Sequence, residues 1–162
     1  MRVGILVLSD KGSRGERKDL SGELLREMCE EAGFSVEVFK ILPDEKDEIV
    51  QTLKNWCDEL KLDLILTSGG TGLHPRDVTP DATKEVIEKE VPGIAEYIRF
   101  VSFSSTPMAA LSRAIAGIRK ETLIVNLPGS PKAIKEIMPS LVKVLKHGVE
   151  KLKGDDSECG GG

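Results

Sequence analysis

Three polar segments of the sequence have residue types that could bind a phosphorylated ligand or its metal ion. The first is Thr67-Ser68-Gly69-Gly70-Thr71-Gly72. Its glycines permit positive φ and a close approach to a ligand, and successive N–H groups in such a loop can form an anion-binding nest. The segment is neither a P-loop, because no Gly-Lys-Ser/Thr ends it, nor a dinucleotide-binding fingerprint. A tight turn after a strand explains the same residues, so both interpretations stay open.

The second segment is Arg76-Asp77-Val78-Thr79-Pro80-Asp81. Its last three residues are explained as the N-cap, the first residue and the first-turn acid of a helix. Arg76 and Asp77 precede that cap and have no such explanation. Asp77 is therefore a candidate Mg²⁺ ligand. The alternative is a surface ion pair between Arg76 and Asp77, which would contribute little energy.

The third segment is Asn126-Leu127-Pro128-Gly129-Ser130-Pro131-Lys132, at the start of the last helix. Ser130 is expected to cap this helix and Pro131 to begin it. Lys132 then lies in the first turn, where a cation opposes the helix dipole. An anion bound at the helix N-terminus would resolve the conflict. We favour that interpretation over an exposed lysine that tolerates a small cost.

Two more segments carry carboxylates. Asp10 ends the first apolar run and is well placed to meet a ligand, and Ser13 follows it in a loop. Asp19 or Ser21 is expected to cap the next helix. Asp44 stands at the head of another predicted helix, and capping alone explains its residue type.

Histidine and cysteine offer little chemistry. His74 and His147 have no partner at metal-ligand spacing, and no Ser-His-Asp or Cys-His arrangement is visible. Cys29, Cys57 and Cys159 form no Cys-x-x-Cys pair, which is typical of a reduced, intracellular protein. We expect the first two to be buried or half-buried thiols.

The elements that must position these segments alternate between strand and helix. Strands are predicted at residues 2–9, 34–42 and 62–66, and helices at 20–32, 44–60, 80–90, 94–105 and 130–152. Residues 113–118 and 122–126 predict a hairpin, while 107–112 stay undecided. The pattern predicts one α/β domain over residues 1–153 with a mostly parallel, mixed sheet, followed by a flexible polar tail at 154–162. Ligands of such sheets bind beyond the carboxyl ends of the strands, so the polar loops should meet at one rim.

Composition excludes several functions. The chain has 162 residues, a formal charge of −4 and 4% aromatic residues. An acidic chain with few stacking platforms is not expected to bind nucleic acid. No apolar run approaches the ~20 residues of a membrane span, and Met1 leads directly into an apolar strand. We therefore expect a cytoplasmic protein.

These motifs, in this order, resemble the MogA/MoaB family of molybdenum-cofactor proteins, and of its members the MogA type. The matching stretches are Leu6-Val7-Leu8-Ser9-Asp10, Leu42-Pro43-Asp44-Glu45, Thr67 to Gly72, Arg76 to Thr83, Leu111-Ser112-Arg113 and Asn126 to Ala133. The resemblance covers residues 2–152. It implies a three-layer α/β/α sandwich, a homotrimer, and transfer of AMP from ATP to the terminal phosphate of molybdopterin, with release of pyrophosphate. It further implies hand-off of the product to a protein that inserts molybdate.

The resemblance also implies roles for particular residues. Asp44 and Asp77 match the family's catalytic aspartates, so Asp44 is expected to face a ligand as well as to cap a helix. Both are candidate ligands of a Mg²⁺ ion that accompanies ATP. The expected binding residues are Asp10, Ser13, Thr67, Ser68, Gly69, Gly70, Thr71, Gly72, Arg76, Ser112, Arg113, Pro128, Gly129, Ser130 and Lys132. Arg76, Arg113 and Lys132 would supply positive charge.

Three alternatives remain. The chain could be a non-catalytic module that holds the pterin and passes it on, although such a carrier would not need a carboxylate pair. It could be a related transferase that acts on another phosphorylated small molecule. The Cys159-Gly160-Gly161-Gly162 end is similar to that of sulfur carriers, but those have a ubiquitin-like fold, so a flexible tail is the better interpretation.

Overall fold

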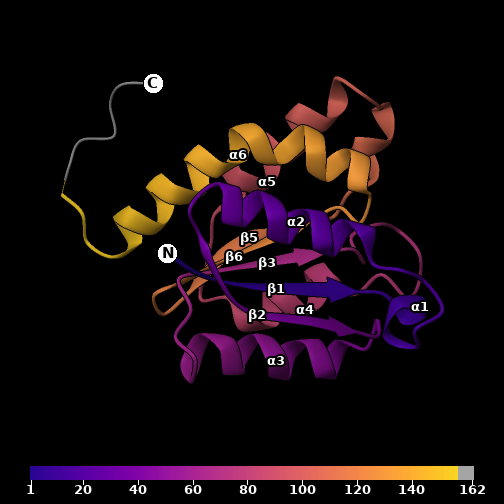
Figure 1. The fold of residues 1–162 in the computed structure, drawn as a ribbon, viewed down its shortest axis with the longest axis horizontal. Coiled ribbons are helices and arrows are strands. Elements are labelled where there is room, and N and C mark those ends of the chain that lie inside the picture. The colour runs from indigo at the N-terminus through magenta and orange to yellow at the C-terminus, as the bar shows by residue number, and fades with distance from the viewer. Residues whose placement is uncertain (157–162) are drawn as a thin grey trace.

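The computed structural model of the protein describes residues 1–156. One mixed sheet has the strand order β2-β1-β3-β6-β5-β4 (Figure 1). The strands are β1 (Arg2–Leu8), β2 (Ser35–Leu42), β3 (Leu64–Ser68), β4 (Lys89–Glu90), β5 (Ala116–Arg119) and β6 (Thr122–Leu127). β1 pairs in parallel with β2 and β3, and β3 pairs in parallel with β6. β5 runs antiparallel to both β4 and β6.

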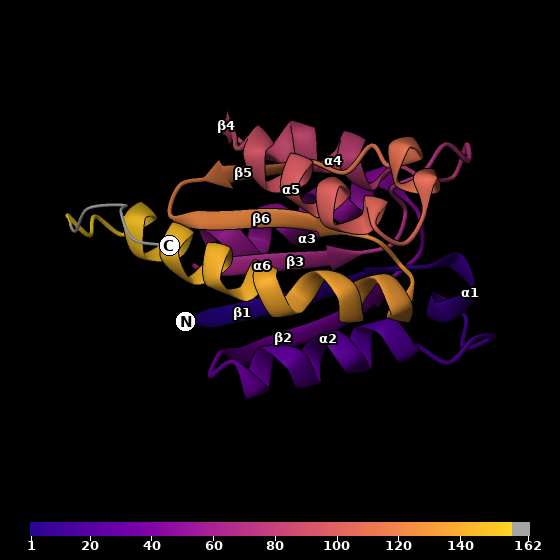
Figure 2. The same cartoon turned by 90° about the horizontal axis from the view of Figure 1, so that it is seen from above.

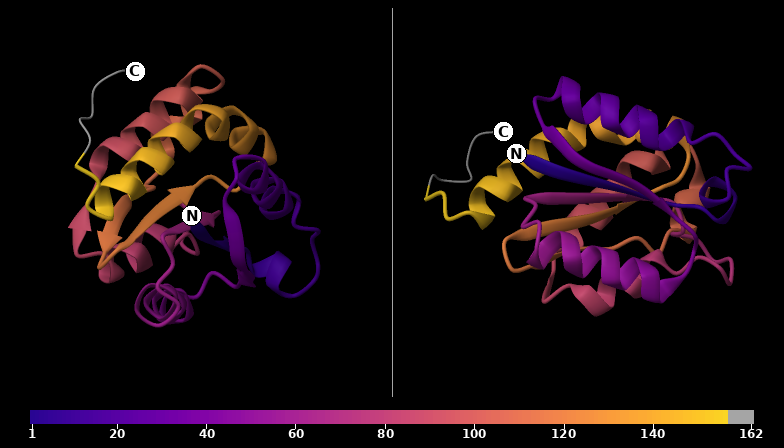
Figure 3. Two further views of the ribbon diagram at one scale, coloured as in Figure 1. Left: turned by 60° about the vertical axis from the view of Figure 1, so that its left-hand side comes forward. Right: turned by 60° about the horizontal axis from the view of Figure 1, so that its bottom comes forward.

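The helices lie on both faces of this sheet. They are α1 (Asp10–Ser13), α2 (Leu20–Glu31), α3 (Lys46–Asp58), α4 (Thr79–Val86), α5 (Pro92–Phe103) and α6 (Pro131–Leu152), with a 3₁₀ turn η1 (Pro107–Leu111) after α5. Figure 2 shows α2, α5 and α6 over one face. Figure 3 shows α3 on the opposite face. This arrangement confirms the predicted three-layer α/β/α class.

The continuous apolar run of β1 follows from this sandwich. Val3 and Ile5 belong to the buried cluster that includes residues of α2, α5 and α6. Leu6 and Leu8 belong to the second cluster, formed with α3 and α4. Because successive strand residues point to opposite faces, a strand covered on both sides must be apolar at nearly every position.

The predicted helix over residues 80–90 is wrong in its second half. α4 ends at Val86, and Ile87 already has extended backbone. The chain then pairs with β5 through bonds from Glu88 N to Ile118 O and from Val91 N to Ala116 O. Pro92 disfavours a helical conformation at the residue before it, which helps to end the helix before Val91. The sheet therefore has two antiparallel pairs rather than the one expected.

Other local expectations can be checked directly. Gly33 ends α2 with a φ of +85°. Cys29 and Cys57 are buried free thiols, as expected. Residues 107–112, which stayed undecided, contain η1. Within residues 1–156, none of the helices combines the length and apolar content that a membrane crossing needs. Residues 157–162, and with them the Cys159 end, lie outside the described part of the chain.

Candidate active site

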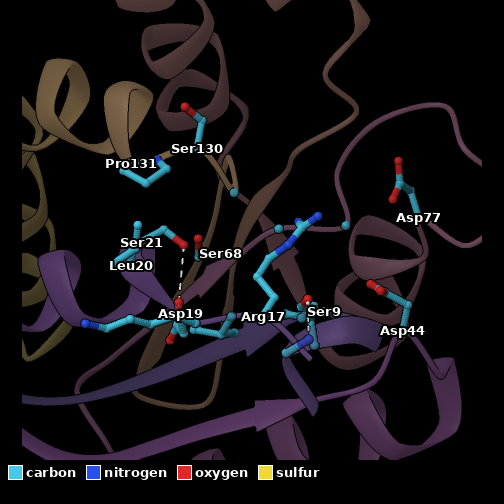
Figure 4. A pocket seen from close by; sticks show the side chains of 17 residues that line it. Ser9, Arg17, Asp19, Leu20, Ser21, Asp44, Ser68, Asp77, Ser130 and Pro131 are labelled. Carbon is cyan, nitrogen blue, oxygen red and sulfur yellow. Dashed lines mark hydrogen bonds between the residues drawn. The ribbon is translucent and has the colours of Figure 1, made fainter. Parts of the chain in front are cut away.

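A cavity of about 610 Å³ opens at the carboxyl ends of the central strands. Its walls come from the loop after β1, the loop after β3, the turn before α6, and Asp44 beyond β2. These are the loops that the sequence placed at one rim. Figure 4 shows Ser130 and Pro131 at one side of this cavity, with Asp44 and Asp77 at the other.

The glycine loop forms the floor because its backbone passes close to two strand ends. Gly69 and Gly70 have φ of +98° and +67°. Gly69 N–H donates to Leu127 O at 3.1 Å, and a Cβ on Gly69 would lie 2.6 Å from Leu8 O. The N–H groups of Gly70, Thr71 and Gly72 donate to no other group of residues 1–156. These three amides, and not that of Gly69, are free to meet an anion.

A buried chain of polar side chains supports this floor. Asn126 Nδ2 donates to Thr67 Oγ1 and to Thr83 Oγ1, both at 3.0 Å. Thr83 Oγ1 donates to Thr79 O at 2.8 Å, and Thr79 Oγ1 donates to Gly69 O at 3.0 Å. Thr67 is fully buried, so it holds the loop from below and does not line the cavity. The expectation that Thr79 caps α4 is wrong, because its hydroxyl is used for Gly69.

Asp10 and Asp44 hold each other in a reciprocal clasp between β1 and β2. Asp10 N–H donates to Asp44 Oδ2 at 3.1 Å, and Asp44 N–H donates to Asp10 Oδ1 at 2.9 Å. The expectation that Asp44 caps α3 is wrong: Glu45 takes the cap position, and no side chain accepts there. Asp44 Oδ2 instead accepts the hydrogen bond from Asp10 N–H.

The second oxygen of Asp44 is left without a partner. Asp44 Oδ1 is buried and forms no hydrogen bond within residues 1–156. Burial raises the pKa of Asp44 above its usual range, and the nearby carboxylates of Asp10 and Asp77 act in the same direction. A buried carboxylate oxygen of this kind favours a cation or a donor brought by a ligand.

Arg76 is engaged within the protein. Its Nε and Nη2 donate to the two carboxylate oxygens of Asp10 at 3.1 and 3.0 Å, and Nη2 also donates to Glu45 at 2.8 Å. This fork holds the pKa of Asp10 below its usual range. The alternative of an Arg76–Asp77 ion pair is therefore wrong, because Arg76 pairs with Asp10 and Glu45. This pairing ties the loop that carries Asp77 to the Asp10–Asp44 clasp.

Arg113 is also engaged, as a brace for the glycine loop. Its Nε donates to Gly72 O at 3.0 Å, and its Nη2 donates to Asp77 O at 2.6 Å. The same guanidinium pairs with Asp81 at 3.1 Å, and Arg113 N–H donates to Thr71 O at 2.8 Å. Arg113 thus fixes the loop between the glycines and Asp77, and it does not line the cavity.

Asp77 lies on the wall of the cavity. Its Oδ2 accepts from His74 N–H at 3.2 Å, and His74 Nδ1 accepts from Arg76 N–H at 3.0 Å. His74 therefore helps to shape the loop that carries Arg76 and Asp77. Within residues 1–156, no three His, Cys, Asp or Glu side chains converge as a cage for a metal ion.

The turn before α6 closes the cavity beside the glycine loop. Ser130 Oγ accepts from Ala133 N–H at 3.4 Å, which confirms it as the cap of α6. Ser68 Oγ donates to Pro128 O at 2.9 Å. A Cβ on Gly129 would lie 3.3 Å from the Cα of Gly69, so the two loops touch through their backbones.

The predicted residues thus divide into two groups. The cavity is lined by Asp44, Ser68, Gly69, Gly70, Asp77, Gly129 and Ser130. Asp10, Ser13, Thr67, Thr71, Gly72, Arg76, Ser112, Arg113, Pro128 and Lys132 lie outside this lining. Some of the second group bond directly to the first, as Asp10 does to Asp44 and Arg113 to Asp77. Others contact neighbouring residues: Ser13 Oγ donates to Asp10 O at 2.8 Å, and Ser112 O accepts from Arg99 at 3.4 Å.

Some lining residues were missed. Most of them lie between the end of β1 and the start of α2, and one is the first residue of α6: Val7, Leu8, Ser9, Gly12, Arg17, Lys18, Leu20, Ser21 and Pro131. Asp19 Oδ1 does cap α2, accepting from Gly22 N–H at 2.7 Å. The one signal that could have found them is the pair Arg17-Lys18 directly before that cap, in a loop already placed at the rim.

Comparison with known proteins identifies the family. The family model described as "Probable molybdopterin binding domain" matches residues 4–147. A molybdopterin adenylyltransferase from Helicobacter pylori (strain J99) is 41% identical over 157 residues, which cover 96% of this chain and 89% of the relative. The molybdenum cofactor synthesis protein cinnamon of Drosophila melanogaster is 47% identical over 154 residues, or 94% of this chain, and the chain spans 26% of that protein.

The fold has close counterparts among solved structures. The crystal structure of the molybdopterin biosynthesis enzyme MoaB from Thermus thermophilus matches with a TM-score of 0.89 and 51% identity, over 95% of this chain and 97% of that one. A molybdopterin biosynthesis protein from Mycobacterium abscessus matches with a TM-score of 0.88 and 36% identity, over 94% and 96% of the two chains. These matches confirm the resemblance drawn from the motifs: the chain belongs to the MogA/MoaB-like family of the probable molybdopterin binding domain.

Proposed function

We propose that this chain is a molybdopterin adenylyltransferase, which transfers AMP from Mg-ATP to the terminal phosphate of molybdopterin and releases pyrophosphate. One observation carries the proposal: Asp44 and Asp77 face the same cavity beside a glycine loop with free amides, and Asp44 Oδ1 is buried without a partner. The name of the Helicobacter pylori relative supports the same activity.

The reaction needs positioning and charge neutralisation more than a strong base. A phosphate monoester has its second pKa near ~6, so most of it is a dianion at neutral pH. Its oxygen attacks the α-phosphorus of ATP, a new P–O bond forms, and pyrophosphate leaves with the electron pair of the broken bond. No proton must be removed, which agrees with a cavity lining that contains no histidine.

The carboxylates fit a Mg²⁺ ion that arrives with ATP. Mg²⁺ is commonly held by one or two carboxylates and completes its shell with water and substrate phosphates, so a full protein cage is not needed. Asp44 would hold the ion through its free Oδ1, and Asp77 through its carboxylate. When bound, Mg²⁺ neutralises the triphosphate and the leaving pyrophosphate.

The other groups of the site hold the ligand in place. The amide of Gly70, which lines the cavity and has no partner within residues 1–156, could donate to a phosphate as the N–H groups of backbone nests do. The N-terminus of α6 adds its dipole at Ser130, and Lys132 stands exposed in the first turn. Arg113 fixes the positions of the glycine loop and of Asp77 relative to each other by donating to the carbonyl oxygens of Gly72 and Asp77.

The decisive experiment is to incubate the protein with molybdopterin, ATP and Mg²⁺ and to measure adenylylated pterin and pyrophosphate. Asp77→Asn should abolish transfer and leave pterin binding intact. Asp47→Asn is the matched control, because Asp47 is an exposed carboxylate on α3 that does not line the cavity. If Asp77→Asn retains full activity, Asp77 has no part in the mechanism. If the wild type binds pterin but forms no product, the chain is a carrier module.

We further propose that the protein acts as a homotrimer in the cytoplasm and hands its product to a molybdate-insertion protein. Exposed apolar side chains on α5 and η1 support self-association: Phe100 is 73% exposed, Met108 63% and Leu111 49%. Single apolar residues at a surface are ordinary, but a group of them marks an interface. Light scattering should give a trimer mass that Phe100→Ser reduces. A wild type that is monomeric at micromolar concentration contradicts this assembly.

A further inference from the structure

The cations expected to neutralise a ligand's phosphates are largely committed to other contacts. Arg76 is paired with Asp10 and Glu45. Arg113 is paired with Asp81 and binds two carbonyl oxygens. Neither arginine lines the cavity. A phosphorylated ligand in this cavity would therefore have to find its positive charge elsewhere.

The charged side chains of the cavity lining would all be negative if the segment between α1 and α2 did not contribute two cations. The lining contains the carboxylates of Asp19, Asp44 and Asp77, and its cationic side chains are those of Arg17 and Lys18. An uncompensated group of three carboxylates would repel a triphosphate. Apart from a Mg²⁺ ion that a nucleotide would bring, the positive charge of the lining therefore comes from side chains of the short segment between α1 and α2.

Arg17 is the member of that segment whose side chain is shown reaching into the cavity. Figure 4 shows it extended into the open centre, between the side that carries Ser130 and the side that carries Asp44 and Asp77. Arg17 is exposed and forms no hydrogen bond or ion pair within residues 1–156. Arg14, in the same loop, is by contrast bonded to Glu16 at 2.9 Å and does not line the cavity.

We infer that Arg17 is the phosphate-binding cation of this site and bridges the two sides of the cavity by binding the polyphosphate of the nucleotide. The inference rests on the proposed function in that the ligand is taken to be a nucleoside triphosphate. A guanidinium suits the role because its planar fork bonds two phosphate oxygens at once and keeps its charge at any physiological pH. An unpaired arginine also loses no existing ion pair when the ligand arrives.

The test compares binding of three probes to the full chain by calorimetry: ATP with Mg²⁺, inorganic pyrophosphate, and adenosine. Arg17→Ala should weaken ATP and pyrophosphate binding by about tenfold to a hundredfold, the range of a hydrogen-bonded charge. Adenosine affinity should stay unchanged, because that probe has no phosphate. The affinity of Arg17→Lys for ATP and pyrophosphate should lie between those of the wild type and Arg17→Ala, because lysine keeps the charge but lacks the planar pair of donors. Arg14→Ala, which removes the same charge from the same loop, should stay within about twofold of the wild type.

Several results would overturn the assignment. An equal loss of adenosine and ATP affinity in Arg17→Ala would mean that Arg17 only orders the loop. Unchanged pyrophosphate and ATP affinity would remove Arg17 from the site, and a large loss in Lys18→Ala alone would transfer the role to Lys18. The binding comparison decides the matter whether or not the wild type transfers AMP, so failure of the proposed function and failure of this inference are separate outcomes.

Discussion

Gly69→Ala should destabilise the protein by an amount that follows from two separate costs. A non-glycine residue at a left-handed φ costs roughly 1–2 kcal/mol, and Gly69 has a φ of +98°. The added Cβ would also lie 2.6 Å from Leu8 O, where only the backbone of β1 could give way. Overpacking of this kind costs roughly 1–3 kcal/mol. We therefore expect a total loss of roughly 2–5 kcal/mol in the free energy of unfolding.

Two other glycines separate these costs. Gly33 has a φ of +85° but nothing within 4 Å of an added Cβ, so Gly33→Ala should show the conformational cost alone. Gly93, in the first turn of α5, has neither a positive φ nor a close neighbour. Gly93→Ala should therefore be neutral or more stable by up to ~1 kcal/mol.

The assay is urea unfolding followed by circular dichroism, with linear extrapolation to zero denaturant. ATP binding is measured on the same proteins, because a displaced Gly69 should also move the floor of the cavity. The order of stability should be Gly93→Ala first, then Gly33→Ala, then Gly69→Ala. A Gly69→Ala protein that is no less stable than Gly33→Ala would refute the argument that the loop and β1 are in tight contact.

Three further predictions concern the polar groups around the cavity. Burial raises the folded-state pKa of Asp44. Ionisation of this carboxyl group therefore lowers the free energy of unfolding as the pH rises above the unfolded-state pKa, and the loss is complete above the folded-state pKa. Asp44→Asn should therefore abolish transfer yet unfold at higher urea than the wild type at pH 7, an advantage that disappears as the pH falls below the unfolded pKa. Asn126→Ala removes the donor from two buried hydroxyl groups, those of Thr67 and Thr83, and should lose roughly 2–4 kcal/mol in urea unfolding. The exposed Asn55→Ala should change by less than about 0.5 kcal/mol, and equal losses in the two variants would mean that the buried network does not stabilise the fold. Arg76→Met should slow transfer at least about tenfold while stability changes by less than about 1 kcal/mol, because its ion pairs are exposed; Arg14→Met is its control, and an unchanged rate would exclude positioning by Arg76.

The fold follows from the sequence where local patterns decide it. The doubly covered strands are continuous apolar runs, and α2 and α6 have their caps at Asp19 and Ser130 as expected. β4 could not be recognised, because a two-residue strand is defined by its partner β5 rather than by its own residues. Local signals continued the preceding helix through it.

The sequence predicts where the site lies but not the hydrogen bonds and ion pairs within it. Three loops rich in glycine and aspartate do meet at one rim. Asp44 looked like a cap until its distant partner Asp10 was known, and Arg76 looked like a ligand cation until its pairing with Asp10, 66 residues away, was seen. Asn126 could have been noticed as the one amide in a strand whose other residues, apart from Thr122, are apolar, because a buried polar residue must find partners.

The position of β6 in the sheet affects how the protein must be made. β6 inserts between β3 and β5, and Gly69 N–H donates to Leu127 O. The glycine loop after β3 is therefore completed by residues that are synthesised about 60 positions later. During synthesis β1, β2 and β3 can pair while residues 122–131 are still inside the ribosome, but the cavity then lacks one wall. A ligand that needs the finished cavity can stabilise only the completed sheet, by mass action. It cannot rescue a nascent or truncated chain that stops before Ser130.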